Sequence, residues 1–221
     1  MPGYKAVIFD LDGTLLDTVA DIADAVNLTL EQYGWAAQPI ERYRVLVGAG
    51  LDELLELILG RHAEDQAFFQ AFRDKVVMYY TQRMTSKTRP YSGIEPILQQ
   101  LQEWQTPKAV LSNKEHEKAN HVVNHFFSAK QLAPVVGAQA GVPVKPDPTN
   151  AYNIADELGF APSDILYVGD TPTDIQTARR AGMLPLGVEW GFRPKEELWQ
   201  EGAHTILAHP EELLNFFRSG R

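Results

Sequence analysis

Two aspartates, Asp10 and Asp12, stand directly after a short apolar run at residues 6–9. A carboxylate can attack phosphorus and form an acyl phosphate, which divides one difficult displacement into two easier ones. A second carboxyl group two residues further on could protonate the departing alkoxide and later deprotonate water. Acid–base help of this kind contributes ~10²- to 10⁴-fold in rate. The spacing of the two acids therefore indicates phosphoryl transfer to and from a carboxylate.

Two more acids, Asp170 and Asp174, follow a second apolar run at residues 165–168. Ionised carboxylates and a phosphate repel one another unless a cation lies between them. Mg²⁺ prefers oxygen ligands in near-octahedral geometry and retains several waters, so it suits such a site. The Lys145 ammonium and the Ser112 hydroxyl could hold the non-bridging phosphate oxygens as charge redistributes.

The elements that must position these groups are strands that alternate with helices. Short apolar runs typical of buried parallel strands occur at residues 6–9, 109–111, 135–136, 165–168 and 184–188. Residues 18–87 interrupt the alternation with helical spacing only. We predict an α/β fold with a Rossmann-like parallel sheet, helices on both faces and an inserted all-helical cap domain. The predicted core comprises residues 1–17 and 88–221, and the predicted cap comprises residues 18–87.

The polar residues named above lie where such sheets bind ligands, beyond the carboxyl ends of the strands. Asn113 stands beside Ser112 after the second core strand, and Lys145 precedes a predicted helix. We therefore expect the acids, hydroxyl, amide and lysine to converge at one edge of the sheet. A competing interpretation for Asp170 and Asp174 is capping of the helix that follows them.

Composition narrows the class of protein. The 221 residues include 20 Lys and Arg against 29 Asp and Glu, a formal net charge of −9. That balance argues against a nucleic-acid partner or an anionic membrane surface. The absence of cysteine excludes disulfides, thiolate metal sites and a cysteine nucleophile. No apolar stretch reaches the ~18 residues of a membrane span, and the N-terminal residues lack a signal-peptide pattern, so we expect a cytoplasmic protein. The sequence does not determine the oligomeric state, and we expect a monomer or a homodimer.

Four motifs together resemble the signature of the haloacid dehalogenase superfamily, in its phosphoglycolate-phosphatase-like branch. They are FDLDGTLLDT at residues 9–18, LSNK at 111–114, KPDP at 145–148 and VGDTPTD at 168–174. The resemblance covers essentially the whole chain, and that family places a helical cap between the first and second motifs. It implies Mg²⁺ as cofactor and a small phosphorylated metabolite as substrate.

The resemblance also implies roles for individual residues. Asp10 would be the nucleophile and Asp12 the acid–base group, with Ser112 binding phosphate and Lys145 stabilising charge. The Mg²⁺ ligands would be Asp10, the backbone carbonyl of Asp12 and Asp170, with Asp174 orienting the waters of the ion. The substrate contacts expected outside the acids are Thr14, Gly48, Ser112, Asn113 and Lys145.

Three features have two interpretations each. The glycines at residues 48–50 would let backbone N–H groups at the next helix approach an anion, which makes Gly48 a candidate substrate contact, or they form a plain turn. Arg42 and Arg44 are expected to be solvated helix charges, and the alternative is a contact to a substrate carboxylate. Trp190-Gly191-Phe192 could line the mouth of the site or cap the sheet.

Two other activities use similar residues. A receiver-type signalling domain also carries an acyl phosphate, but Asp12 would hasten its hydrolysis and a long cap would exclude partners. A β-phosphoglucomutase-like mutase shares the cap and the motifs. Phosphatases of this branch usually have Thr where such mutases often have Val, so Thr14 favours hydrolysis. The sequence leaves open which phosphate ester is the substrate and which cap residues select it.

Overall fold

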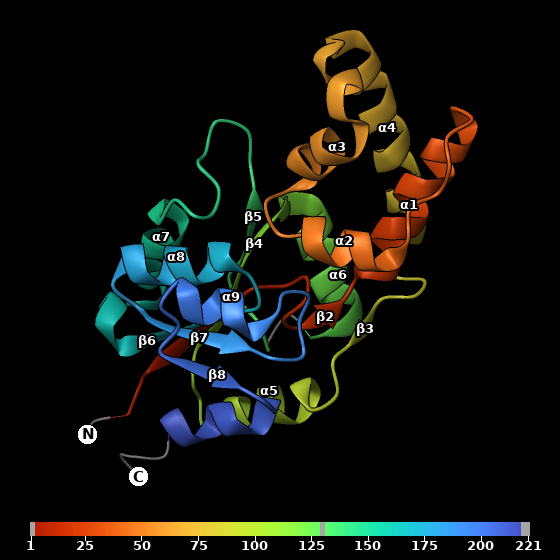
Figure 1. The fold of residues 1–221 in the computed structure, drawn as a ribbon. Coiled ribbons are helices and arrows are strands. Elements are labelled where there is room, and N and C mark those ends of the chain that lie inside the picture. The colour runs from red at the N-terminus through yellow and green to blue at the C-terminus, as the bar shows by residue number, and fades with distance from the viewer. Residues whose placement is uncertain (1–2, 129–130, 218–221) are drawn as a thin grey trace.

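The core of the computed structural model, which describes residues 3–128 and 131–217, is a six-stranded sheet whose paired strands are all parallel (Figure 1). The strands lie in the order β5-β4-β1-β6-β7-β8. Their bounds are β1 (Ala6–Phe9), β4 (Lys108–Glu115), β5 (Val135–Ala138), β6 (Ile165–Gly169), β7 (Leu184–Val188) and β8 (Thr205–Leu207). The chain moves outward from β1 to β5 and then returns to the other side of β1. The predicted α/β class is confirmed.

The side chains of successive residues in β1 point to opposite faces of the sheet, as strand geometry requires. Val7 and Phe9 pack with apolar residues of α5 and α6, whereas Ala6 and Ile8 pack with those of α7 and α8. The helices of these two layers are α5 (Ile94–Glu103), α6 (His116–Phe126), α7 (Thr149–Leu158) and α8 (Pro172–Ala181). Both faces are covered, which is why the strands read as unbroken apolar runs.

Shorter elements complete the C-terminal part of the described chain. They are the 3₁₀ helix η2 (Pro162–Asp164), the helix α9 (Lys195–Gln200) and the 3₁₀ helix η3 (Pro210–Phe216). Leu198 of α9 packs with Ile175 of α8, so α9 extends the layer formed by α7 and α8. Among the described residues, no helix combines the length and apolarity needed to cross a bilayer.

A block of helices lies between two very short strands, β2 (Leu16–Asp17) and β3 (Arg89–Pro90). The block comprises α1 (Val19–Gln32), α2 (Ile40–Leu46), α3 (Leu51–Leu59), the 3₁₀ helix η1 (Gly60–Glu64) and α4 (Gln66–Arg83). It projects to one side of the sheet (Figure 1). Because β2 and β3 pair antiparallel, the chain leaves the sheet domain and returns to it at adjacent points.

One buried carboxylate ties this helical block to the returning chain. Asp21 of α1 is fully buried and accepts hydrogen bonds from the backbone N–H groups of Lys87 and Thr88 and from the Thr88 hydroxyl. All the donors are held by this single side chain, at 2.8 to 3.0 Å. Asp21 therefore fixes the direction in which α1 leaves the sheet.

Candidate active site

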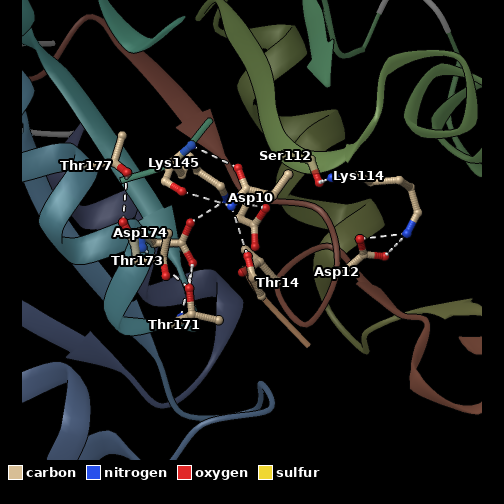
Figure 2. Close-up of polar contacts among 12 residues, drawn as sticks. Asp10, Asp12, Thr14, Ser112, Lys114, Lys145, Thr171, Thr173, Asp174 and Thr177 are labelled. Carbon is tan, nitrogen blue, oxygen red and sulfur yellow. Dashed lines mark hydrogen bonds and ion pairs between the residues drawn. The ribbon is translucent and has the colours of Figure 1, made fainter. Parts of the chain in front are cut away.

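Asp10 follows β1 directly, and its backbone N–H donates to the carbonyl of Val168 in β6. Lys145 Nζ lies 2.7 Å from Asp10 Oδ1 and 2.6 Å from Asp174 Oδ1 (Figure 2). Burial, with the nearby charge of Asp174, raises the pKa of Asp10 from 3.8 to about 7, although Lys145 opposes the rise. Burial alone would lower the pKa of Lys145, but Asp10 and Asp174 raise it well above its ordinary value. Lys145 is therefore a fixed positive charge beside Asp10.

Three carboxylates meet at this point. One oxygen from each of Asp10, Asp170 and Asp174 lies within 4.8 Å of the other two. Asp170 is fully buried, and burial, followed by the charges of Asp10 and Asp174, raises its pKa well above the ordinary value. Lys145 alone does not balance three buried acids. Their crowded oxygen donors fit a small hard divalent cation such as Mg²⁺.

Asp174 combines two tasks that the sequence presented as alternatives. Its Oδ2 accepts hydrogen bonds from the backbone N–H and the hydroxyl of Thr171. Because the Asp174 backbone N–H donates in return to Thr171 Oγ1, the two residues form a capping box at the start of α8. Its Oδ1 accepts from Lys145, and the residue belongs to the group of three acids. The capping interpretation is correct for one oxygen, and it holds the other in place toward Asp10.

The carboxylate of Asp12 points away from this group, toward the opposite side of Asp10 (Figure 2). Lys114 Nζ lies 2.7 Å from each of its oxygens, and the Thr18 hydroxyl donates to Oδ1 at 2.6 Å. Lys114 lies in the second motif, but no role was predicted for it from the sequence. The available signal was its position, because Ser112 and Lys114 lie two apart on β4 and so share a face.

The side chains at the end of β4 connect separate parts of the site. Ser112 is 3% exposed, and its oxygen accepts from the backbone N–H of Lys114, which leaves its own O–H able to donate. The Asn113 amide donates to the carbonyls of Gly48 and Lys145 and accepts from the Lys145 backbone N–H. Asn113 therefore holds the cap loop at Gly48 against the segment that carries Lys145.

Thr14, which was predicted from the sequence to contact the substrate, faces Asp170 and is not among the residues that line the cavity. It is fully buried, and its hydroxyl donates to Asp170 Oδ1 at 3.0 Å. The Trp190 indole donates to the Thr14 carbonyl at 3.0 Å, and the Phe192 backbone N–H donates to Asp170 Oδ2 at 2.8 Å. Thr14 and the Trp190-Gly191-Phe192 segment therefore support Asp170, a role that the sequence left undecided for the segment and missed for Thr14.

Two glycines make room for the Asp170 side chain. Gly13 has a φ of +90°, and a Cβ there would lie 2.2 Å from Asp170 Oδ2. A Cβ on Gly191 would lie 2.2 Å from the Asp170 Cβ. Larger residues at either position would displace this carboxylate, so both glycines belong to the construction of the site.

A cavity of about 320 Å³ opens in front of Asp10, between the helical block and the sheet. Its core side includes Asp10, Asp12, Ser112, Asn113 and Lys114, and the loop at Gly48 forms part of the opposite side. That volume lies near the lower end of the ~300–1,000 Å³ typical of small-molecule sites. The cavity therefore brings a small ligand to Asp10 and Asp12 together.

Comparisons with known proteins agree with this geometry. The family model described as haloacid dehalogenase-like hydrolase matches residues 7–188. Phosphoglycolate phosphatase of Xylella fastidiosa is 30% identical over 212 residues, which cover 95% of this chain and 91% of that protein. The corresponding enzyme of Neisseria meningitidis is 32% identical over 203 residues, which cover 90% and 86%. The crystal structure of a predicted phosphoglycolate phosphatase from Haemophilus somnus gives a TM-score of 0.89 at 25% identity, covering 96% of this chain and 97% of that one.

The family match spans most of the chain and includes the strands and turns that carry Asp10, Asp12, Lys145 and Asp170. The similar proteins named above also align over nearly the full length, so the helical block is included in the likeness. This chain therefore belongs to the haloacid dehalogenase-like hydrolase family, among the phosphatases similar to phosphoglycolate phosphatase.

Proposed function

We propose that this phosphatase hydrolyses a small phosphate monoester by transferring the phosphoryl group first to Asp10 and then to water, with Mg²⁺ as cofactor. The observation that carries the proposal is the placement of Asp10 at the cavity, with Lys145 on one side and Asp12 on the other. A nucleophile, a fixed positive charge and a separate acid–base group are what a two-step phosphoryl transfer requires. The relatives named for phosphoglycolate make that ester the first to assay.

In the first step, an Asp10 oxygen forms a bond to phosphorus while the bond between phosphorus and the ester oxygen breaks. Asp12 donates a proton to that departing oxygen, so a neutral alcohol leaves. Lys145 and the Ser112 hydroxyl hold the non-bridging oxygens. In the second step Asp12 takes a proton from water, the oxygen of which attacks phosphorus. Phosphate leaves, and Asp10 and Asp12 return to their starting states.

The residues that would hold Mg²⁺ are Asp10, Asp170 and Asp174, together with the backbone carbonyl of Asp12 that the family resemblance implies. When bound, the ion supplies positive charge that offsets the repulsion between these carboxylates and the phosphate. The contacts of Thr14 and Phe192 with Asp170 fix that ligand in advance. Asp12 keeps its carboxylate on the other side of Asp10, away from these ligands, and it can carry the proton for the leaving group once Lys114 releases one of its oxygens.

We also propose the division into a core of residues 1–17 and 88–221 and a cap of residues 18–87. The pairing of β2 with β3 supports it, because the helical block is attached to the core through two adjacent strands. A cap over the cavity would exclude water that competes with the ester. Cytoplasmic location and a monomeric or homodimeric state stay predictions.

The test is a panel of phosphate esters assayed for released inorganic phosphate in the presence of Mg²⁺. The panel includes phosphoglycolate, a nucleoside monophosphate, an aryl phosphate and hexose 1-phosphate. We expect phosphate release from at least one ester and none from the Asp10→Asn variant. Conversion of hexose 1-phosphate to hexose 6-phosphate without phosphate release would establish the mutase alternative instead. Inactivity toward every ester would refute the proposal.

A further inference from the structure

The cap side of the cavity is an apolar wall. Its side chains come from α1, α3, α4 and the end of α2, and they are Ile22, Ala25, Val47, Leu51, Leu54 and Val76. Burial of ligand carbon against such a wall is favourable by ~25 cal/mol per Å². A carboxylate placed there would lose its water without gaining a hydrogen bond. The wall therefore suits the carbon skeleton of a leaving group.

The cationic side chains on this part of the cavity already have acidic partners. Arg73 Nε lies 2.5 Å from Asp52 Oδ1, and Arg73 Nη2 lies 3.2 Å from Glu115 Oε1. Lys118 also forms an ion pair with Glu115. Apart from Asp10, Asp12 and Lys114, the charged residues among the described lining of the cavity are these two bases and the three acids Asp52, Glu53 and Glu115. A second anionic group on the ligand would meet a net negative surface.

Two other positive groups near the cavity, the Lys114 ammonium and the N-terminus of α3, also have negative partners. Lys114 donates to both oxygens of Asp12. The N-terminus of α3 carries a partial positive charge, but Asp52 and Glu53 stand in its first turn and offset it. Neither source is free to hold a carboxylate of the substrate.

Arg42 and Arg44, the arginines considered as carboxylate ligands, do not line the cavity. Arg42 donates to the Gln38 side chain and to the Leu57 carbonyl. Arg44 lies 3.7 Å from Asp17, at the base of the cap. The sequence suggested them because they precede the glycine loop, but α2 directs them elsewhere.

Tyr80 of α4 lies beside the apolar wall. The residue lines the cavity and is 8% exposed, and its hydroxyl has no acceptor in the described part of the chain. Burial raises the pKa of Tyr80 to about 12, so the hydroxyl keeps its proton. The Lys114 ammonium lies 5.2 Å from its ring centroid, which places the ring near Asp12. The hydroxyl oxygen itself is enclosed by protein, so Tyr80 contributes its ring, and not a donor, to the lining of the cavity.

We propose that the cavity selects a phosphate monoester whose leaving group has no negative charge and packs its carbon skeleton on the cap wall. An alcohol or sugar fits this description, whereas glycolate does not. The inference rests on the proposed phosphatase function and refines it. It predicts that the chain differs in substrate preference from the relatives named for phosphoglycolate.

The test uses two pairs of esters that differ only in a carboxylate against a hydroxymethyl group. The pairs are phosphoglycolate with 2-hydroxyethyl phosphate, and 3-phosphoglycerate with glycerol 3-phosphate. We expect kcat/KM to be higher for the uncharged member of each pair by about tenfold or more. Equal or higher values for the carboxylates would overturn the inference while leaving the phosphatase function intact. Inactivity toward all four esters and toward an aryl phosphate would refute the phosphatase function itself.

Two variants separate charge from general damage. Glu115→Gln removes the shared partner of Arg73 and Lys118. The ratio of kcat/KM for the uncharged ester to kcat/KM for the carboxylate should therefore fall by about threefold or more. Glu117→Gln, on the exposed part of α6 and outside the cavity, makes the same change in net charge and should leave the ratio unchanged. Equal effects of the two variants, or none from Glu115→Gln, would contradict the charge argument.

Discussion

Replacing Asp10 by asparagine should stabilise the metal-free protein above neutral pH, although it removes the proposed nucleophile. Asp10 is 4% exposed, and its carboxylate lies near those of Asp170 and Asp174 with one lysine between them. Burial, followed by the charge of Asp174, raises its pKa from 3.8 to about 7. In the absence of a cation, the ionised form therefore opposes folding. Asparagine imitates the neutral acid at every pH.

The magnitude follows from the two pKa values. A carboxyl group that holds its proton more tightly in the folded chain stabilises the fold only while it is protonated. For Asp10 this contribution is complete below pH 3.8 and is lost as the pH rises to about 7. A rise of that size corresponds to about 4 kcal/mol. At pH 8 the free energy of unfolding of the variant should exceed that of the native protein by an amount of this order. At pH 5 the difference should be less than about 2 kcal/mol.

Urea unfolding in EDTA, followed by circular dichroism at pH 5 and pH 8, measures this difference. Asp156→Asn, an exposed acid on α7, is the matched control and should change little at either pH. At pH 8, adding Mg²⁺ should raise the free energy of unfolding of the native protein more than that of the Asp10→Asn variant. The reasoning fails if Asp10→Asn is the less stable protein at pH 8 in EDTA, or if the difference does not depend on pH.

Three further outcomes are expected. EDTA should abolish phosphate release, and Mg²⁺ should restore it better than Ca²⁺, whose looser coordination misaligns the attack; full activity in metal-free buffer would contradict this. Asp12→Asn should keep Mg²⁺ binding in calorimetry, because the ligand that we propose there is the backbone carbonyl, but slow turnover by ~10²-fold or more; unchanged turnover would remove Asp12 from the mechanism. Asp21→Ala should lower the free energy of unfolding by at least about 2 kcal/mol, because the donors of Lys87 and Thr88 lose their acceptor; urea denaturation would show it, and a loss under about 0.5 kcal/mol would contradict it.

The sheet and the position of the acids were predictable because both depend on local pattern and chain order. Buried parallel strands read as apolar runs, and their carboxyl ends must lie at one edge. Asp10 and Asp170 follow such runs directly, so their proximity needed no knowledge of side-chain packing. The helical block was predictable for the same reason, because its apolar residues recur at helical spacing over a long stretch without a strand-like pattern.

The remaining parts of the site depend on contacts between segments far apart in the sequence. Lys114 reaches Asp12 across the end of the sheet, and Tyr80 comes to the cavity only through the packing of the cap. Thr14 lies in a recognisable motif, yet the direction of its hydroxyl toward Asp170 follows from the turn at Gly13. The strands β2 and β3 are two residues each, too short to produce a periodic signal.

The formation of a phosphorylated Asp10 is the central claim, and trapping it is the most direct test. The Asp12→Asn variant would be mixed rapidly with radiolabelled aryl phosphate, quenched in acid and mapped by peptide. An aryl leaving group needs little protonation, so this variant should form the acyl phosphate and hydrolyse it slowly. We expect label on the peptide that contains Asp10. A variant that carries both Asp12→Asn and Asp10→Asn should take up no label. Label on another residue, or a labelling burst that survives Asp10→Asn, would contradict the account.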